Sequence, residues 1–184
     1  AKVIALANSG QDAQTAIKQA AEFGMMGGDQ KFVALLIDVA DIQAVGLPVA
    51  RGLLATAGFY WNMDDHTRNL ASRFAAKMGG RVPGMIQAGV YSSTLQYTRA
   101  VAKAGSKDPA SVLKVLRGIE IEDDFARRGH LRADNLMTHD MYLAEVKTPE
   151  QSSKPQDVYT ILGTVSGEDA APPLATSACP MLKS

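Results

Sequence analysis

The sequence predicts an α/β protein whose first part contains a parallel sheet. Three short apolar runs fall within the first 57 residues, and a helical pattern follows each of the first two. Strands that alternate with helices in this way form parallel sheets, which are usually covered on both faces. A helix-rich stretch spans residues 65–118, and strand patterns return after residue 125. We therefore expect one α/β unit and a second group of helices that brings no strands of its own.

The first predicted strand is the apolar run 2–7, which ends at the turn residues Asn8-Ser9-Gly10. A short continuous run of this kind is typical of a strand buried on both faces. A helix is expected next, because alanine and isoleucine recur at helical spacing after Asp12 and before Gly24. Asp12 is the predicted N-cap, and Gly24 is the predicted residue just past the C-terminal end.

Two more strands are predicted before residue 58. Residues 31–37 repeat the strand pattern, residues 38–47 form a polar turn and a short helix ahead of Pro48, and residues 52–57 form the third apolar run. Three strands make a small sheet for this class of protein. The shortage predicts that the sequence is the second half of a larger protein, whose earlier residues complete the sheet.

The middle of the chain is predicted to be helical. Residues 65–78 carry apolar side chains four residues apart, with Asp65 as the predicted N-cap. Residues 85–104 form a longer helix, and Asp108-Pro109 begin a third as N-cap and first helical residue.

The last part of the chain returns to strands. Turn residues after Phe125 and the alternating run 141–146 predict a hairpin, and residues 158–165 predict a final strand before an irregular tail.

Composition excludes several function classes. Nineteen basic and nineteen acidic side chains cancel, so no net field would attract nucleic acid or anionic lipid. No apolar run approaches the roughly 20 residues needed to span a bilayer. The single cysteine, Cys179, forms no disulfide within this chain. Its thiol is either reduced or paired with a cysteine outside the chain.

Motifs of common catalytic and phosphate sites are missing from the sequence. It contains no Gly-rich phosphate loop, no G-x-S-x-G and no cysteine pair for zinc. Asp64-Asp65-His66 and His139-Asp140 resemble pieces of metal sites, but adjacent residues point in different directions. We expect helix capping and polar loops at these positions, and neither a metal nor a cofactor.

Ligand-site candidates follow the predicted strands directly. In open α/β sheets, small molecules bind beyond the C-terminal ends of the strands, where turns and helix N-termini expose polar groups. This rule selects Asn8 and Ser9, then Asp38, then Phe59-Tyr60-Trp61. Asp38 either holds an ammonium or hydroxyl group or caps the next helix. The aromatic side chains either wall an apolar pocket or pack at a hinge.

Several segments in a fixed order carry a resemblance to a known family. They are residues 3–10, 16–24, 52–56 with 59–61, 87–92, 140–143 and 146–152. Together they resemble the branched-chain amino acid-binding proteins of bacterial ABC importers, which are type I periplasmic binding proteins. The likeness covers essentially the whole chain, but only about the second half of such a protein.

The resemblance implies two α/β lobes that are joined by three crossings and trap a small ligand between them. It assigns residues 1–58 and 142–184 to the second lobe, 65–135 to the incomplete first lobe, and 59–64 and 136–141 to hinge crossings. It implies cleft roles for Asn8, Ser9, Asp38, Tyr60, Trp61 and, on a first-lobe helix, Tyr91.

The function implied is that of a non-enzymatic periplasmic receptor. It would deliver a small amino acid, or an aromatic or apolar carboxylate, to an ABC permease, and its partner would be the missing N-terminal half or a second copy of the chain. Two other functions stay open: a ligand-sensing regulatory domain of the same fold, and a small flavodoxin-like enzyme complete in 184 residues. The enzyme would need acid, base or nucleophile groups that converge in a pocket.

Overall fold

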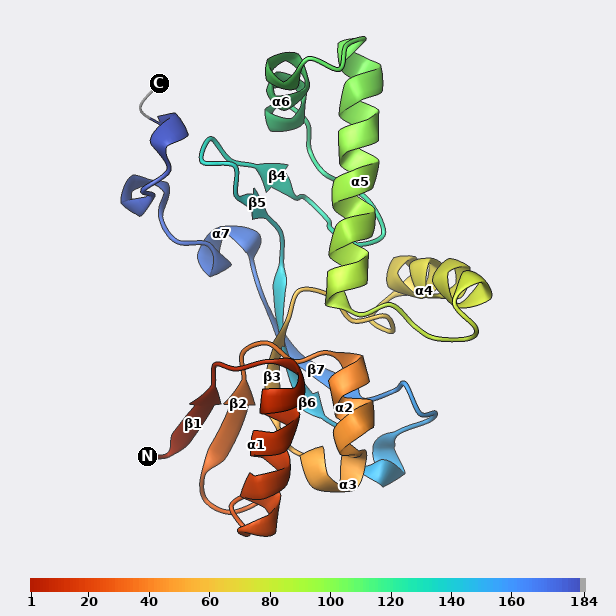
Figure 1. Ribbon diagram of the computed structural model, residues 1–184, viewed down its shortest axis with the longest axis vertical. Coiled ribbons are helices and arrows are strands. Elements are labelled where there is room, and N and C mark those ends of the chain that lie inside the picture. Colours follow the sequence, from red (N-terminus) through yellow and green to blue (C-terminus); the bar gives the residue numbers. More distant parts are fainter. Residues whose placement is uncertain (183–184) are drawn as a thin grey trace. The chain divides into compact units, whose positions relative to one another are not determined.

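The computed structural model describes residues 1–182 and divides into two compact units (Figure 1). The first unit comprises residues 1–85 and 142–164, and the second comprises residues 86–141 and the residues from 165 on.

A five-stranded sheet forms the centre of the first unit. Its order is β1 (Val3–Leu6), β2 (Lys31–Ala34), β3 (Leu54–Ala57), β6 (Met141–Val146) and β7 (Tyr159–Val165). The first three strands are parallel, whereas β6 runs antiparallel to β3, with Ala55 opposite Ala144. The sheet is therefore mixed. The hairpin predicted after Phe125 forms between His130–Leu131 and Met137–Thr138, but residues 141–146 pair with β3 and are not part of it.

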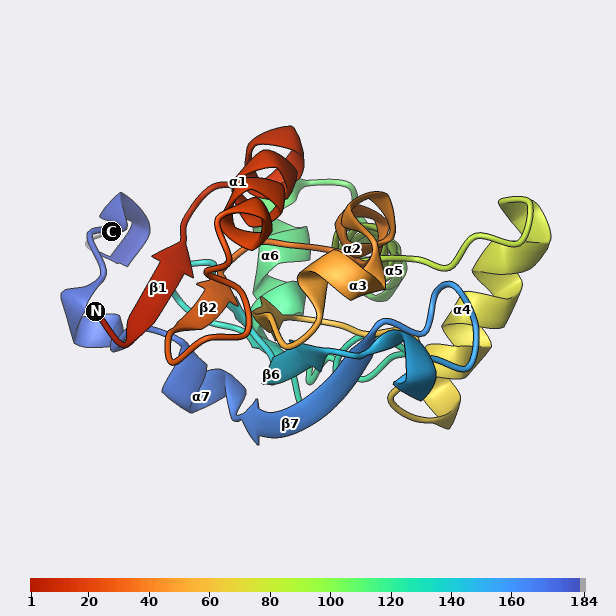
Figure 2. The ribbon, with the colours of Figure 1, turned by 90° about the horizontal axis from the view of Figure 1, so that it is seen from below.

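Three helices lie on one face of this sheet: α1 (Gly10–Glu22), α2 (Val39–Val45) and α3 (Leu47–Ala50) (Figure 2). Ile17 and Ile42 are the large side chains that α1 and α2 bury completely. Burying a side chain of this size contributes about 2 kcal/mol. The predicted short helix ahead of Pro48 is α2, which ends at Val45, but the sequence did not predict α3, in whose first turn Pro48 lies. Proline is tolerated there, since a first-turn N–H has no partner within the helix.

Within the described residues of the first unit, the helices α1, α2 and α3 all lie on the same face of the sheet, contrary to the expected cover on both faces. Side chains alternate between the two faces of a strand, so Val3 and Leu143 point away from the helices. They are 56% and 37% exposed. The sheet itself has five strands rather than the three predicted from residues 1–57, because β6 and β7 join it.

The capping residues of two helices differ from those predicted. Helix α1 begins at Gly10 with Ser9 as its N-cap, and Asp12 lies within the first turn. Gly10 has a φ of +57°, a conformation that favours glycine. Helix α4 (Asp65–Lys77) is capped by Asp64, not Asp65, because Asp64 accepts a hydrogen bond from the Thr67 N–H at 2.9 Å. The Thr67 hydroxyl accepts one in return from the Asp64 N–H, which completes a capping box.

The second unit contains α5 (Met85–Ala104), α6 (Pro109–Arg117), the antiparallel strands β4 (His130–Leu131) and β5 (Met137–Thr138), and the short α7 (Gly167–Ala170). The predicted bounds of α5 and the Asp108 cap of α6 are confirmed. Short 3-10 turns complete the chain at 149–151 in the first unit and at 174–176 and 180–182 in the second.

A buried polar network joins α5 to the loop that follows α6. The Asp123 carboxylate accepts hydrogen bonds from the Ser92 hydroxyl at 2.7 Å and the Gln96 side-chain amide at 2.8 Å. It also accepts two from the backbone N–H groups of Phe125 and Ala126. Burial alone would raise the pKa of Asp123, but these hydrogen bonds lower it.

Candidate functional site

The turns after β1 and β2 lie next to each other at one edge of the first unit's sheet. Leu6 at the end of β1 pairs with Ala34 at the end of β2. The helices that follow are also joined near their N-terminal ends, because the Gln14 amide of α1 donates to the Asp41 carboxylate of α2 at 2.8 Å. Asn8 and Ser9 after β1 and Asp38 after β2 therefore belong to one region.

Asn8 presents an acceptor that lacks a donor. Its side-chain oxygen Oδ1 is buried and accepts no hydrogen bond from any residue within 1–182. An unpaired buried acceptor is destabilising, and in most native structures such a group meets a protein donor, a water or a ligand. Ser9 is exposed, and its hydroxyl does not cap α1, although Ser9 occupies the N-cap position. A ligand group with an N–H or O–H would satisfy Asn8.

Asp38 caps α2, as one of its two predicted roles required. Its Oδ1 accepts a hydrogen bond from the Val39 N–H at 2.8 Å. Its own N–H donates to Asp41 Oδ2 at 3.0 Å, which closes a reciprocal capping box. Carboxylates accept hydrogen bonds from cationic and hydroxyl groups, so the chemistry of Asp38 also suits its second predicted role.

The aromatic triplet is packed into the first unit. Phe59, Tyr60 and Trp61 are all buried. The Tyr60 hydroxyl donates to Asp157 at 3.0 Å, and the Trp61 indole N–H donates to the carbonyl oxygen of Gln156 at 2.9 Å. These contacts agree with the hinge-packing interpretation, and burial raises the pKa of Tyr60.

A cavity of about 340 Å³ lies beside Tyr60. Its other walls include Met63, Tyr142, Lys147, Tyr159 and Ile161. The Lys147 ammonium and the Asp157 carboxylate are 2.7 Å apart, with side chains only 18% and 4% exposed. Burial alone would raise the pKa of Asp157, but hydrogen bonds from Lys147, Ser153 and Tyr60 lower it to about 2. Asp157 is therefore ionised at neutral pH and forms an ion pair with Lys147.

Sequence reasoning missed Lys147 and Asp157. Each is a charged residue beside a strand pattern, Lys147 directly after β6 and Asp157 two residues before β7. Charged side chains are rarely buried unless they are paired, but the sequence shows neither that these two are buried nor that they meet.

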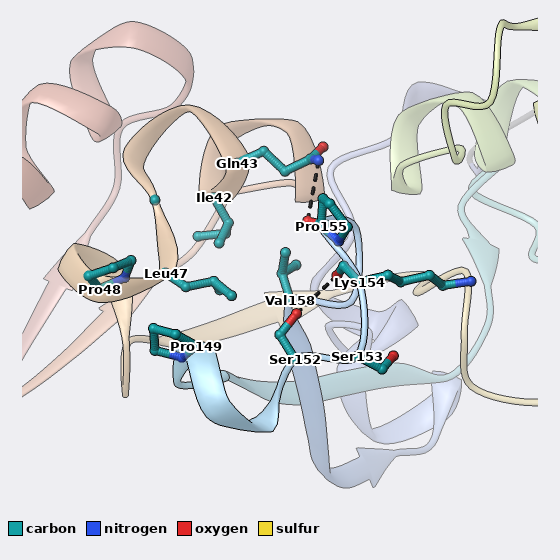
Figure 3. A pocket seen from close by; sticks show the side chains of 11 residues that line it. Ile42, Gln43, Leu47, Pro48, Pro149, Ser152, Ser153, Lys154, Pro155 and Val158 are labelled. Atoms are coloured by element: carbon teal, nitrogen blue, oxygen red, sulfur yellow. Dashed lines mark hydrogen bonds between the residues drawn. The ribbon is translucent and has the colours of Figure 1, made fainter.

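A second hollow in the first unit, about 480 Å³, lies between α2, α3 and the 149–158 segment (Figure 3). Ile42, Leu47, Pro155 and Val158 give it a mostly apolar lining, and the Gln43 amide donates to the Pro155 carbonyl at 3.3 Å across it. None of the predicted site residues lines this hollow, so it is a weaker candidate for the ligand site.

Tyr91 lies on α5 in the second unit, where it is half-buried. Its part in ligand binding stays a prediction. Cys179 is a free, half-buried thiol.

No three His, Cys, Asp or Glu side chains within residues 1–182 gather as a metal would require. Over the same residues, every helix is too short or too polar to cross a bilayer.

Comparison with known proteins extends these observations. Residues 1–154 match the family model described as periplasmic binding protein. A periplasmic binding protein from Burkholderia mallei is 41% identical, with a TM-score of 0.90 over 98% of this chain. A branched-chain amino acid ABC transporter periplasmic ligand-binding protein from Burkholderia xenovorans is 40% identical, with the same TM-score and coverage. The chain spans 48% of the length of each of these two proteins.

A more distant structure shares the fold. The solute-binding protein of an ABC transporter from Rhodopseudomonas palustris, in complex with 3,4-dihydroxybenzoic acid, is 15% identical, with a TM-score of 0.75 over 90% of this chain and 45% of its own. Among curated proteins, no similar sequence was found.

Proposed function

This chain belongs to the periplasmic binding protein family, and we propose that it forms part of the substrate-binding component of an ABC importer. The observation that carries the proposal is its likeness, at 41% identity over 98% of the chain, to a solved periplasmic binding protein. Such proteins bind solutes and catalyse no reaction on them. We propose the periplasm as the location and an ABC permease as the partner that receives the ligand.

A small amino acid is the ligand that we propose first. Asn8 Oδ1 and the Asp38 carboxylate are both hydrogen-bond acceptors, so they suit a ligand that brings donors, such as an ammonium group. The relative from B. xenovorans is named for branched-chain amino acids. An aromatic or apolar carboxylate is the second candidate, because the R. palustris protein of the same fold holds 3,4-dihydroxybenzoic acid.

Binding would act through closure of two lobes. We assign residues 1–58 and 142–184 to the second lobe, 65–135 to the first, and 59–64 and 136–141 to crossings. A ligand that contacts both lobes favours the closed form, because only that form makes both sets of contacts. The buried hydrogen bonds of Tyr60 and Trp61 to Asp157 and Gln156 would hold the crossing at 59–64 firmly to its own lobe.

Exposed apolar side chains on both units suggest a further partner. In the first unit, Val3 and Leu143 are exposed on the sheet; in the second, Ile86, Val90 and Tyr97 are exposed along α5. Large apolar surfaces of this kind mark protein contacts. We propose that the cover is the half of the protein that this chain does not span, or else a second copy of the chain. Light scattering coupled to size-exclusion chromatography of the 184-residue chain distinguishes a dimer from a monomer.

Isothermal titration calorimetry of the full-length protein is the decisive test. Leucine and benzoate are titrated separately, and each solution is then analysed for chemical change. Binding at about micromolar Kd without conversion of the ligand supports a receptor. Conversion would instead support an enzyme, and a panel of amino acids and aromatic acids that all fail to bind would contradict the proposal.

A further inference from the structure

Gly84 lies directly against the carboxylate of Asp38. A β-carbon added at Gly84 would overlap both carboxylate oxygens and the carbon between them. Gly84 is buried and does not have a positive φ. The backbone conformation therefore gives no reason for glycine at this position, whereas the space occupied by Asp38 does.

Asp38 cannot easily move aside to admit a larger residue. Its side chain is short, and its Oδ1 is held by the Val39 N–H at 2.8 Å. Rotation of the carboxylate away from Gly84 would break this cap of α2 and disturb the reciprocal bond to Asp41. The carboxylate is thus held between the first turn of α2 and the backbone of Gly84, just before α5 begins.

We propose that Gly84 is a positioning residue that keeps the Asp38 carboxylate oriented for a cationic group of the ligand. The proposal rests on the proposed function for the identity of that group. A carboxylate that is already fixed in one orientation loses little side-chain entropy when an ammonium group binds. Specificity for ligands that carry an amino group would then depend on Gly84, although Gly84 has no side chain of its own.

The steric part of the proposal is tested without ligand by a double-mutant cycle on the 184-residue chain. Gly84→Ala should lower the urea midpoint of unfolding, whereas in an Asp38→Ala background it should cause no further loss, because the carboxylate is gone. Gly89→Ala is the matched control, since a β-carbon there meets no atom within 4 Å. That change should leave the midpoint unchanged or raise it. An equal loss from Gly84→Ala in both backgrounds would overturn the proposal.

The functional part is tested by calorimetry on the full-length protein with two ligands that differ by one group. Leucine carries an ammonium, and 4-methylpentanoate is the same skeleton without it. Gly84→Ala should weaken leucine binding by about tenfold to a hundredfold, as expected for a damaged charge-assisted hydrogen bond, and leave 4-methylpentanoate binding unchanged. Equal effects on both ligands, or none, would overturn the role in specificity.

The two experiments separate the two hypotheses. If the unaltered protein binds neither ligand, the proposed function fails for leucine-like solutes, while the urea cycle still decides whether Gly84 positions Asp38. If leucine binds and the cycle shows no coupling, the receptor function stands and the role of Gly84 is refuted.

Discussion

Replacing Asp157 by asparagine should destabilise the first unit strongly, because it removes one charge of a buried pair. The Asp157 carboxylate accepts hydrogen bonds from Lys147 at 2.7 Å, from the Tyr60 hydroxyl at 3.0 Å, and from the Ser153 N–H and hydroxyl at 3.0 and 2.9 Å. Asparagine keeps the size of the side chain but loses the charge. The Lys147 ammonium, 18% exposed, would be left without its counter-charge.

The size of the expected stability loss follows from the pKa of Asp157. The pKa of Asp157 is lowered from 3.8 to about 2, and a difference of this size corresponds to about 2.5 kcal/mol in favour of the folded, ionised form. Removal of one partner from a buried pair costs about 3–5 kcal/mol in fully enclosed sites. Because Lys147 keeps some contact with solvent, we expect a loss of about 2–4 kcal/mol in the free energy of unfolding at pH 7.

Urea unfolding followed by fluorescence measures this loss. Trp61 is the only tryptophan of the chain, and its N–H bonds to the residue next to Asp157, so its emission reports on this region. Asp65→Asn is the control, because the Asp65 side chain is 98% exposed and its loss should cost under about 0.5 kcal/mol. The reasoning is refuted if Asp157→Asn lowers the free energy of unfolding no more than the control does. It is also refuted if Asp157→Asn lowers it equally in the unaltered protein and in a Lys147→Met background.

The pH dependence of the free energy of unfolding provides a second test of Asp157. The lowered pKa means that Asp157 contributes its full stabilisation above about pH 3.8, the value in the unfolded chain, and loses it as the pH falls toward about 2. The free energy of unfolding should therefore fall between these two values in the unaltered protein. The fall should be smaller in Asp157→Asn, and equal slopes would contradict the assignment.

Two further changes test the ligand region and a helix cap. Asn8→Ala should leave the urea midpoint unchanged or slightly higher, because no described residue bonds to its buried oxygen. Calorimetry should show that the same variant binds leucine more weakly. A large loss of stability would show that Asn8 serves packing instead. Asp64→Ala should lower the free energy of unfolding by about 1 kcal/mol, the usual value of an N-cap, because its bond to the Thr67 N–H is lost. Asp65→Ala is its neighbouring control, and equal urea curves for the two variants would show that Asp64 is not the cap.

Local patterns in the sequence predicted most of the helices and strands. The apolar spacing of α5 gave its bounds, because a 20-residue helix contains several turns of consistent signal. Asp108 was identified as a cap for the same local reason. The N-cap of α4 was predicted as Asp65 instead of its neighbour Asp64. Thr67, three residues after Asp64, is the signal that identifies Asp64 as the cap.

Contacts between distant parts of the chain could not be predicted in the same way. The alternation in residues 141–146 identifies a strand but not its partner, so the antiparallel pairing with β3 was missed. Tyr60, Lys147 and Asp157 form one network although about 100 residues separate the first from the last. The strand-end rule selected Asn8 and Asp38 because it concerns the topology of a sheet rather than contacts between particular side chains.

The hydrogen bonds to Asp123 have a mechanical consequence for the second unit. Ser92 and Gln96 lie one turn apart on α5, and both donate to the same carboxylate. Rotation of α5 about its own axis would carry one of the two donors away from that carboxylate. The backbone N–H groups of Phe125 and Ala126 tie the adjoining loop to the same point. Helix α5 and the loop at residues 123–126 should therefore move together as one rigid body.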